Sequence, residues 1–459
     1  MSESKGFSSS FGAIAAAVGS AVGLGNIWRF PYICGQYGGG AFLLVYLCFV
    51  FFIGMALMIT EFVMGRRTGR TPIFAYESLV PSPKQRWWRY AGLLGLVTSF
   101  LILALYLVIS GWTTNYFAES LVGAHIGLDS VAISDHFDFF STSALRPIVF
   151  IAVFLLITGA VILGGVQKGI ERVSKILMPV LVVLLVVLCV RSATLPGASA
   201  GFAYLFKPDF TQLTGQGVLA ALGQALFSLS VGMGVMIVYG SYLPKDDNIL
   251  KTSIWITVCD TLIAILAGIA IFPAVFASGQ DPAGGPGLVF MTLPVVFNSM
   301  NPADGLPIGT IFESIFFLLL VIAALTSAIS LLEAQVAWGE EYKKGKSQRT
   351  RNTIVICLLM LALSAILSLS NGVCGNFTIG GKSLFAFVDQ LNSIYLPPLC
   401  SLCAVIFLGW VVDKEAIRDE LSNHGTIAIP WYKGFLFLVR FVAPLALIIV
   451  LVTGIVNSL

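Results

Sequence analysis

Long apolar runs recur along the whole 459-residue chain and limit what it can fold into. Hydrophobic residues make up 57% of the sequence and charged residues 11%, whereas charged residues usually form about a quarter of a soluble globular chain. A run of about 20 apolar residues is long enough to cross a bilayer as a helix. The sequence therefore predicts an all-α polytopic membrane protein with eleven spans, at about 11–34, 41–65, 88–122, 147–164, 173–193, 218–243, 250–277, 308–338, 352–369, 383–411 and 434–457.

Two of these runs contain residues that interrupt a membrane helix. The first run includes Gly23, Gly25 and Asn26, and glycine costs roughly 1 kcal/mol relative to alanine inside a helix. The sixth run repeats the pattern as Val-Gly-Met-Gly at residues 231–234. A break at bilayer depth frees backbone groups that need polar partners, and paired breaks are typical of transport sites between inverted repeats. Glycines that let helices pack closely are the alternative interpretation.

The positions of the two breaks predict how the chain is organised. Spans one to five and six to ten each begin with a broken helix, and an odd number of spans per set inverts the second set. We therefore expect five-helix repeats over 11–193 and 218–411, after an N-terminal segment 1–10, and a peripheral eleventh helix over 434–457. The long segment 278–307 is rich in proline and apolar residues and is expected to form an extracellular lid.

Positively charged residues predict the orientation in the membrane. Lysine and arginine cluster between spans two and three, four and five, and eight and nine, and are sparse in the alternate loops. By the positive-inside rule the N-terminus is cytoplasmic, and eleven spans then put the C-terminus outside. No removable signal peptide is expected. The sequence thus predicts a multi-pass protein of the plasma (inner) membrane that contacts lipid and a small molecule, and no nucleic acid.

Residues that support enzymatic chemistry are scarce. No nucleophile–base pair or phosphate-binding loop occurs in a suitable context, so no enzyme is expected. Cys400 and Cys403 form a CxxC inside an apolar run and are interpreted as core packing. His125, His136 and His424 fall in connecting segments, which argues against an imidazole proton relay and against a histidine metal site.

Several motifs together resemble the neurotransmitter:sodium symporter family, in particular its bacterial, leucine-transporter-like amino-acid transporters. They are Asn-Ile-Trp-Arg-Phe-Pro-Tyr at 26–32, Gly-Gly-Gly-Ala-Phe at 38–42, Glu-Phe-Val-Met-Gly-Arg at 61–66, Gly-Gly-Val-Gln-Lys-Gly-Ile-Glu at 164–171, Ser-Leu-Ser-Val-Gly at 228–232 and Leu-Thr-Ser-Ala at 325–328. The resemblance implies sodium-coupled import of an amino acid by alternating access. A non-coupled amino-acid sensor or channel is the competing function, although the rings of like groups that favour a pore are not found.

The resemblance also implies two sodium sites. The ligands of the site nearer the substrate are Ala21 (through its carbonyl), Asn26, Ser228 and Asp260. The ligands of the second site are the carbonyls of Gly19, Val22 and Ala323 and the hydroxyls of Thr326 and Ser327. Judged on the residues alone, the two hydroxyls are explained equally well by hydrogen bonds to the preceding helical turn.

Asp260 departs from the family pattern, which usually has asparagine at this position. A carboxylate at membrane depth is costly and is functional by default. We expect Asp260 to supply the negative charge that chloride provides in animal members, so that chloride is not required. A buried acid held in its protonated form is the alternative.

The substrate pocket implied by the resemblance is mostly apolar. It comprises Ser20, Ala21, Gly23, Gly25, Ile102, Tyr106, Phe227, Ser230, Met233, Ser327 and Leu331. Gly23 takes the place of an aspartate found in monoamine carriers and leaves room for a substrate that brings its own carboxylate. Because no charged residue lines the pocket and an unpaired buried charge is unfavourable, we expect a zwitterionic apolar L-amino acid, aliphatic or aromatic.

Gates are implied on both sides of this pocket. On the outside, Arg29 is expected to face Asp389 or Asn392 of span ten in a shifted or water-bridged pair, with a snorkelling arginine as the alternative. On the inside, Lys5 and Glu341 are the implied pair.

Glu61 is expected to bond to the loosened backbone of the two broken spans.

Overall fold

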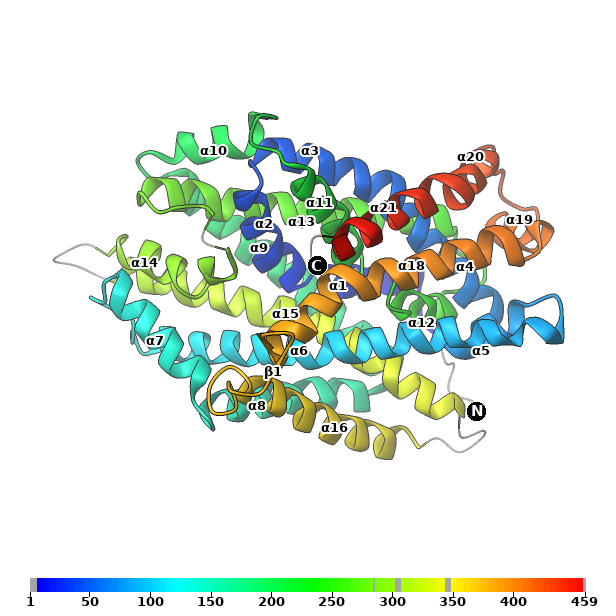
Figure 1. Cartoon of the computed structure of the whole chain (residues 1–459), viewed down its shortest axis with the longest axis horizontal. Coiled ribbons are helices and arrows are strands. Elements are labelled where there is room, and N and C mark those ends of the chain that lie inside the picture. Colours follow the sequence, from blue (N-terminus) through cyan, green and yellow to red (C-terminus); the bar gives the residue numbers. More distant parts are fainter. Residues whose placement is uncertain (1–5, 284, 302–306, 343–347, 457–459) are drawn as a thin grey trace.

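The computed structural model describes residues 6–283, 285–301, 307–342 and 348–456, and these are predominantly helical. The long helices run roughly along one axis of the molecule, with α6 and α15 side by side near its middle (Figure 1). Among the described residues, nine helices are long and apolar enough to cross a membrane. They are α3–α4 (Gly40–Phe49 and Met55–Thr68), α6 (Arg89–Leu121), α8 (Arg146–Leu163), α9 (Arg172–Ala193), α13 (Ile249–Ala277), α15 (Ile308–Tyr342), α16 (Arg349–Leu369), α17–α18 (Leu384–Gln390 and Leu396–Ile406) and α20–α21 (Tyr432–Phe437 and Ala443–Val456).

The first predicted span is broken, as expected. Helix α1 (Ser10–Ala21) ends where Val22 adopts an extended conformation, with ψ of 106°. A π-helical turn (Gly25–Arg29) then leads into α2 (Phe30–Gln36), and the two arms meet at a bend of 46°. Together these arms are apolar and long enough to form a tenth span.

The sixth predicted span is interrupted more strongly than the first. Residues 218–243 form two short helices, α11 (Gly215–Ser228) and α12 (Val235–Tyr242), instead of one long helix. Between them Ser230, Gly232 and Gly234 all have positive φ, at 53°, 75° and 73°. A Cβ at position 232 would lie 2.4 Å from the carbonyl oxygen of Pro397, so only glycine fits there.

Small residues let the helices around these breaks approach closely. Helix α1 packs against α9, α13 and α15 and is lined by buried alanines, including Ala13, Ala16 and Ala17. Helices α4 and α12 touch backbone to backbone, since a Cβ on Gly65 would lie 2.0 Å from the carbonyl oxygen of Ile237. The two interrupted segments are therefore held at the centre of the bundle.

Shorter elements lie at the ends of the long helices. They are α5 (Pro72–Leu79), α7 (Ser130–Thr142), α10 (Ala198–Phe206), α14 (Thr292–Asn298), α19 (Lys414–Leu421) and the antiparallel strands β1 (Thr378–Ile379) and β2 (Lys382–Ser383). Helices α7 and α14 lie at one end of the bundle, and α5 and α19 at the other (Figure 1). The described part of the segment 278–307 is folded, with Phe290, Leu293 and Val296 buried.

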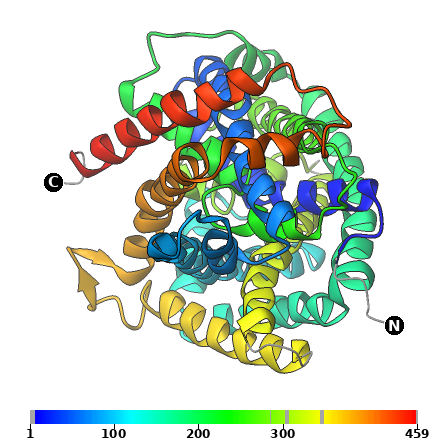
Figure 2. The same ribbon diagram turned by 90° about the vertical axis from the view of Figure 1, so that its right-hand side faces the viewer.

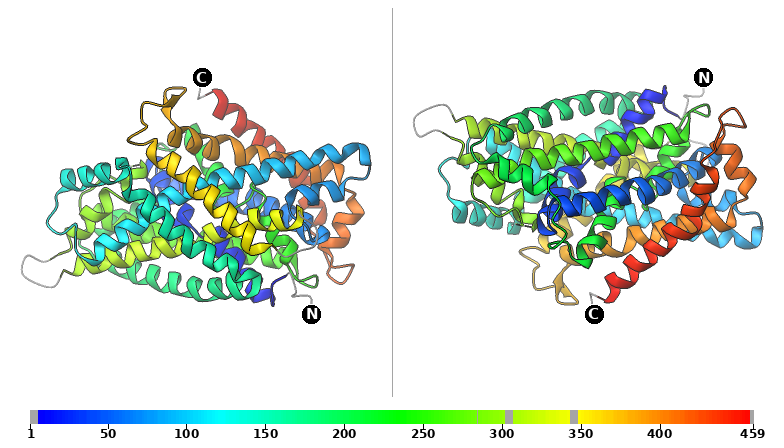
Figure 3. Two further views of the ribbon diagram at one scale, coloured as in Figure 1. Left: turned by 90° about the horizontal axis from the view of Figure 1, so that it is seen from below. Right: turned by 90° about the horizontal axis from the view of Figure 1, so that it is seen from above.

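Helix α21 lies on the outside of the bundle, as the views along and across the helices show (Figures 2 and 3). It packs mainly against α18. Helix α21 is therefore peripheral to the helices that surround the two breaks.

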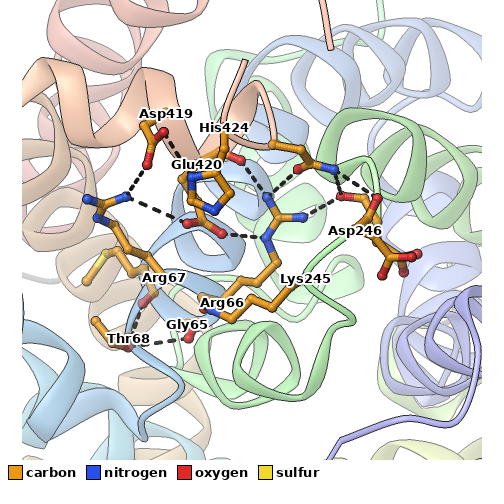
Figure 4. Close-up of polar contacts among 12 residues, drawn as sticks. Gly65, Arg66, Arg67, Thr68, Lys245, Asp246, Asp419, Glu420 and His424 are labelled. Carbon is orange, nitrogen blue, oxygen red and sulfur yellow. Dashed lines mark hydrogen bonds and ion pairs between the residues drawn. The ribbon is translucent and has the colours of Figure 1, made fainter. Parts of the chain in front are cut away.

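A buried polar cluster ties the end of α4 to α19 (Figure 4). Arg66, whose side chain is 1% exposed, pairs with the carboxylate of Glu420 and donates to the backbone carbonyl of Asp247. The neighbouring Arg67 bonds Asp419 at 3.1 Å. The basic residues after the second predicted span are thus partly structural.

Candidate functional site

The two breaks touch each other. Ser230 Oγ donates a hydrogen bond to the carbonyl oxygen of Ser20 at 3.0 Å, which joins the break of α11–α12 to the end of α1. Gln224 Nε2 donates to the carbonyl oxygen of Gly25 at 2.7 Å. Backbone carbonyls around the first break therefore find side-chain partners on the other interrupted span, as burial requires.

One cavity lies between the breaks, α6 and α15, and it brings together all eleven residues predicted for the pocket. Ile102, Phe227, Met233 and Leu331 form its apolar part, and Ser20, Ala21, Gly23, Gly25, Tyr106, Ser230 and Ser327 line the rest. A mostly apolar wall with a few convergent polar groups is typical of a small-molecule site.

The polar end of the cavity is crowded around Gly23. A Cβ at this position would lie 2.2 Å from Ser327 Oγ and 2.8 Å from the hydroxyl oxygen of Tyr106. That hydroxyl accepts a hydrogen bond from the backbone N–H of Leu24 at 3.1 Å. The Leu24 amide, at the break between α1 and the second half-helix, is thus directed at a hydroxyl that lines the cavity.

A buried carboxylate, that of Asp260, lies beside this end of the cavity. Asn26 Nδ2 donates to Asp260 Oδ1 at 2.8 Å, and Ser228 Oγ donates to Asp260 Oδ2 at 2.7 Å. Tyr46 donates in turn to Ser228 Oγ at 3.2 Å. Since these partners are neutral, a cation would complete the charge balance, and oxygen ligands suit a hard ion. Ala21, the fourth residue predicted here, ends α1 next to the cavity.

A second group of oxygens joins α1 to α15. Thr326 Oγ1 lies 3.3 Å from the carbonyl oxygen of Val22 and 3.0 Å from that of Ala323. Ser327 Oγ lies 3.5 Å from the carbonyl oxygen of Gly19 and 3.3 Å from that of Val22. Two hydroxyl hydrogens cannot satisfy all of these acceptors, because each hydroxyl donates only once. The surplus of oxygen lone pairs fits a small hard cation.

Of the two hydroxyls, only that of Thr326 also lies within hydrogen-bond distance of the preceding turn of its own helix. Thr326 Oγ1 lies 3.3 Å from the carbonyl oxygen of Ile322, one turn earlier on its own helix. Ser327 Oγ instead faces carbonyls of α1, including that of Ser20 at 3.1 Å. The intrahelical alternative therefore accounts for the threonine better than for the serine.

A second cavity lies beyond Tyr106 and Phe227, which line both cavities and separate them. Arg29, Asp389 and Asn392 all line this outer cavity. Among the described residues no ion pair within 4.0 Å joins Arg29 to Asp389, and Arg29 instead lies over the Phe227 ring at 4.8 Å.

Arg29 has a hydrogen-bond partner on α11 and none on the described residues of span ten. Arg29 Nη1 donates to Gln224 Oε1 at 3.2 Å. Asn392 is 3% exposed, and neither polar atom of its side chain has a hydrogen-bond partner in the part of the chain that the structure describes. An unsatisfied buried amide next to a guanidinium fits the shifted or water-bridged arrangement predicted from the sequence.

Of the predicted inner pair only Glu341 can be described, because Lys5 lies outside the described residues. Glu341 accepts hydrogen bonds from the backbone N–H and the hydroxyl of Thr71, at 2.8 and 2.7 Å. Ser8, near the start of the described chain, donates its backbone N–H to Glu171 at 2.8 Å. The first described residues are therefore tethered to Glu171.

Glu61 supports the break of the sixth predicted span. Its Oε1 accepts a hydrogen bond from the backbone N–H of Gly232 at 2.6 Å, as predicted for that span. Ser330 was missed by sequence reasoning: it accepts from Ser20 Oγ at 2.8 Å and donates to the carbonyl oxygen of Ser327 at 2.7 Å. Its position three residues after Ser327, on the same helix face, is the signal that could have found it.

A known family matches nearly the whole chain. The family model described as the sodium:neurotransmitter symporter family matches residues 5–126 and 140–459. The chain belongs to this family.

Relatives match the chain over almost its whole length. It is 38% identical to the uncharacterized sodium-dependent transporter YhdH of Bacillus subtilis, over 98% of both chains. It is 35% identical to an uncharacterized sodium-dependent transporter of Haemophilus influenzae, over 96% of both chains. Among solved structures, MhsT in complex with L-phenylalanine is similar, with a TM-score of 0.88, 41% identity, and coverage of 98% of this chain and 99% of MhsT.

Proposed function

We propose that this symporter imports a zwitterionic, apolar L-amino acid together with sodium by alternating access. One observation carries the proposal: Ser327 lines the cavity and also belongs to the oxygen group that joins α1 to α15. A substrate and an ion that share such a neighbour stabilise the same arrangement of the two helices. Their binding is then linked, and the linkage is reciprocal.

The substrate class follows from the two ends of the cavity. The carboxylate would lie near the Leu24 amide and the Tyr106 hydroxyl, and the amine near the carbonyls freed by the breaks. The side chain would lie against Ile102, Met233 and Leu331. Flexible Met233 adapts to aliphatic and aromatic shapes, and the binding of L-phenylalanine by MhsT supports this choice.

Two sodium sites complete the proposal. Ala21, Asn26, Ser228 and Asp260 hold the ion next to the substrate, and Gly19, Val22, Ala323, Thr326 and Ser327 hold the other. The Asp260 carboxylate provides the negative charge, so chloride is not required. Each sodium ion that moves inward across 100 mV contributes about 2.3 kcal/mol before its concentration gradient is counted.

The membrane arrangement that we propose has eleven spans in an inverted five-plus-five repeat. Residues 11–193 and 218–411 form the repeats, 278–307 a lid, and 434–457 a peripheral helix, in the plasma (inner) membrane. The N-terminus is cytoplasmic and the C-terminus extracellular. Helix α5, which lies in the basic segment between spans two and three, is at the opposite end of the bundle from α7 and α14, which supports this orientation (Figure 1).

Access to the cavity alternates between two gates in this proposal. Tyr106 and Phe227 close it toward the outer cavity, where Arg29 faces Asp389 and Asn392. Lys5 and Glu341 belong to the inner gate. Because Arg29 already lies over Phe227, displacement of the arginine would free the aromatic gate.

Uptake by proteoliposomes tests the proposal against a non-coupled sensor or channel. An inward sodium gradient should drive accumulation of labelled phenylalanine or leucine above the outside concentration, and an equal potassium gradient should not. Equilibration without accumulation would indicate a channel, and binding without uptake a sensor. Competition with a panel of unlabelled amino acids tests the substrate class, which is wrong if glycine or glutamate competes best.

A further inference from the structure

Two histidines and a glutamate meet at the end of the bundle that carries α7. Glu119 comes from the last turn of α6, His125 from the connection after it, and His136 from α7. One ligand atom from each lies within 4.8 Å of the other two. A histidine metal site is not expected from the sequence, because the histidines fall in connecting segments, but the fold brings these three side chains together.

The imidazole of His125 is held with one nitrogen directed into this group. Its Nδ1 bonds Glu313 Oε1 of α15 at 2.6 Å, and its ring stacks on Tyr116 with centroids 5.1 Å apart. The side chain is 1% exposed. Nε2 has no hydrogen-bond partner among the described residues and lies 3.5 Å from Glu119 Oε2. A carboxylate on one imidazole nitrogen, with the other nitrogen free, is the usual setting of a metal-binding histidine.

His136 and the surrounding charges complete this setting. His136 Nε2 lies 3.0 Å from the same Glu119 oxygen, and its side chain is one-quarter exposed, which leaves a route from solvent. Arg146 is 4.0 Å from the other Glu119 oxygen but is half exposed. Two carboxylates, Glu119 and Glu313, thus face the imidazole of His125 from different helices.

We propose that Glu119, His125 and His136 bind a divalent transition-metal ion of the zinc class, with a water molecule as the fourth ligand. Two imidazoles and one carboxylate around an open position match the donor set and number that zinc accepts. Glu313 acts as a positioning residue, since it bonds the nitrogen of His125 that faces away from the metal. Magnesium and calcium prefer sites made of oxygen alone.

A bound ion would fasten α7 to the ends of α6 and α15. Helix α7 also stacks Phe137 on Phe290, in the described part of the segment 278–307, with ring centroids 5.5 Å apart. The metal would therefore stabilise the structure that covers this end of the bundle, at a distance from the cavity between the breaks.

Zinc titration of the purified full-length protein tests the proposal. We expect one zinc ion to remain bound after desalting, measured by elemental analysis, and zinc but not magnesium to raise the unfolding temperature. Cobalt in place of zinc should give the visible absorption of a four-coordinate ion. His136→Ala should abolish that absorption and weaken zinc binding by at least tenfold, and Glu313→Gln should weaken it by about 10- to 100-fold.

His424→Ala is the matched control. His424 also pairs with a carboxylate, Asp419 at 3.0 Å, but its side chain is 71% exposed. This variant should bind zinc like the unmodified protein. The proposal is overturned if the unmodified protein retains no zinc, or if His136→Ala retains as much as His424→Ala.

Discussion

Gly23 lies so close to Ser327 that a single methyl group at position 23 would come within 2.2 Å of the Ser327 hydroxyl oxygen. Both residues line the cavity between the two breaks. The spacing leaves no room for a side chain at the point where α1 gives way to the second half-helix. Packing against Ser327 therefore requires glycine at position 23.

Gly23→Ala should therefore abolish or strongly reduce sodium-driven uptake. An overpacking cost of about 1–3 kcal/mol corresponds to about 5- to 150-fold weaker substrate binding. Scintillation proximity or uptake assays on purified protein would measure the change. Gly434→Ala is the control, because a Cβ there meets nothing within 4 Å. Full activity of Gly23→Ala would show that the space beside Ser327 can accommodate a methyl group, contrary to this prediction.

Thr326→Val should weaken sodium binding without a change in shape. The substitution removes the oxygen that lies 3.3 Å from the Val22 carbonyl. We expect the sodium concentration for half-maximal uptake to rise about 5- to 10-fold, within the usual range of coupling energies. Thr158→Val is the matched control, since that buried hydroxyl bonds only its own helix, to the Phe154 carbonyl at 2.9 Å. Equal sodium dependence in the two variants would refute the assignment of Thr326.

Chloride replacement tests the role of Asp260. Uptake by the unmodified symporter should be unchanged when gluconate replaces chloride, because Asp260 supplies the charge next to Ser228. Asp260→Asn should lose about 90% of uptake without chloride, a tenfold or 1.4 kcal/mol effect, and recover part of it when chloride is restored. Asp209→Asn, in an exposed loop, is the control. A collapse of unmodified uptake in gluconate would contradict this assignment.

Arg66→Gln should destabilise the fold. It leaves Glu420 buried without its charged partner, which typically costs about 3–5 kcal/mol. We expect a large fall in the unfolding temperature of the purified protein. Arg67→Gln is the neighbouring control, because the Arg67 side chain is 31% exposed and surface pairs contribute about 0–1 kcal/mol. A similar fall in both variants would argue against a special role for the buried pair (Figure 4).

The sequence was most informative where a residue type is unusual for its surroundings. Gly23 and Gly25 within an apolar run predicted the first break, and the copy at 231–234 predicted the second. The residues that surround the cavity followed from a resemblance to a known family. Helix periodicity alone does not specify which faces of α6 and α15 meet the breaks.

Other features depend on geometry that the sequence does not encode locally. The positive φ of Ser230 is unusual for a residue with a side chain, and nothing nearby in the sequence indicates it. Arg29 contacts Gln224 and Phe227 of α11, so a search for its partner along span ten alone misses them. His125 and His136 meet only because α7 folds back over the end of α6.

The close backbone contact between Gly65 and Ile237 couples α4 and α12, so that we expect the two helices to move together. Glu61, one helical turn before Gly65, adds a second link between α4 and this segment, because it accepts a hydrogen bond from the Gly232 amide. Any tilt of the short helix after the second break must carry its long neighbour along. Rearrangement at the second break would thereby reach the buried polar cluster around Arg66, the residue that follows Gly65 in α4.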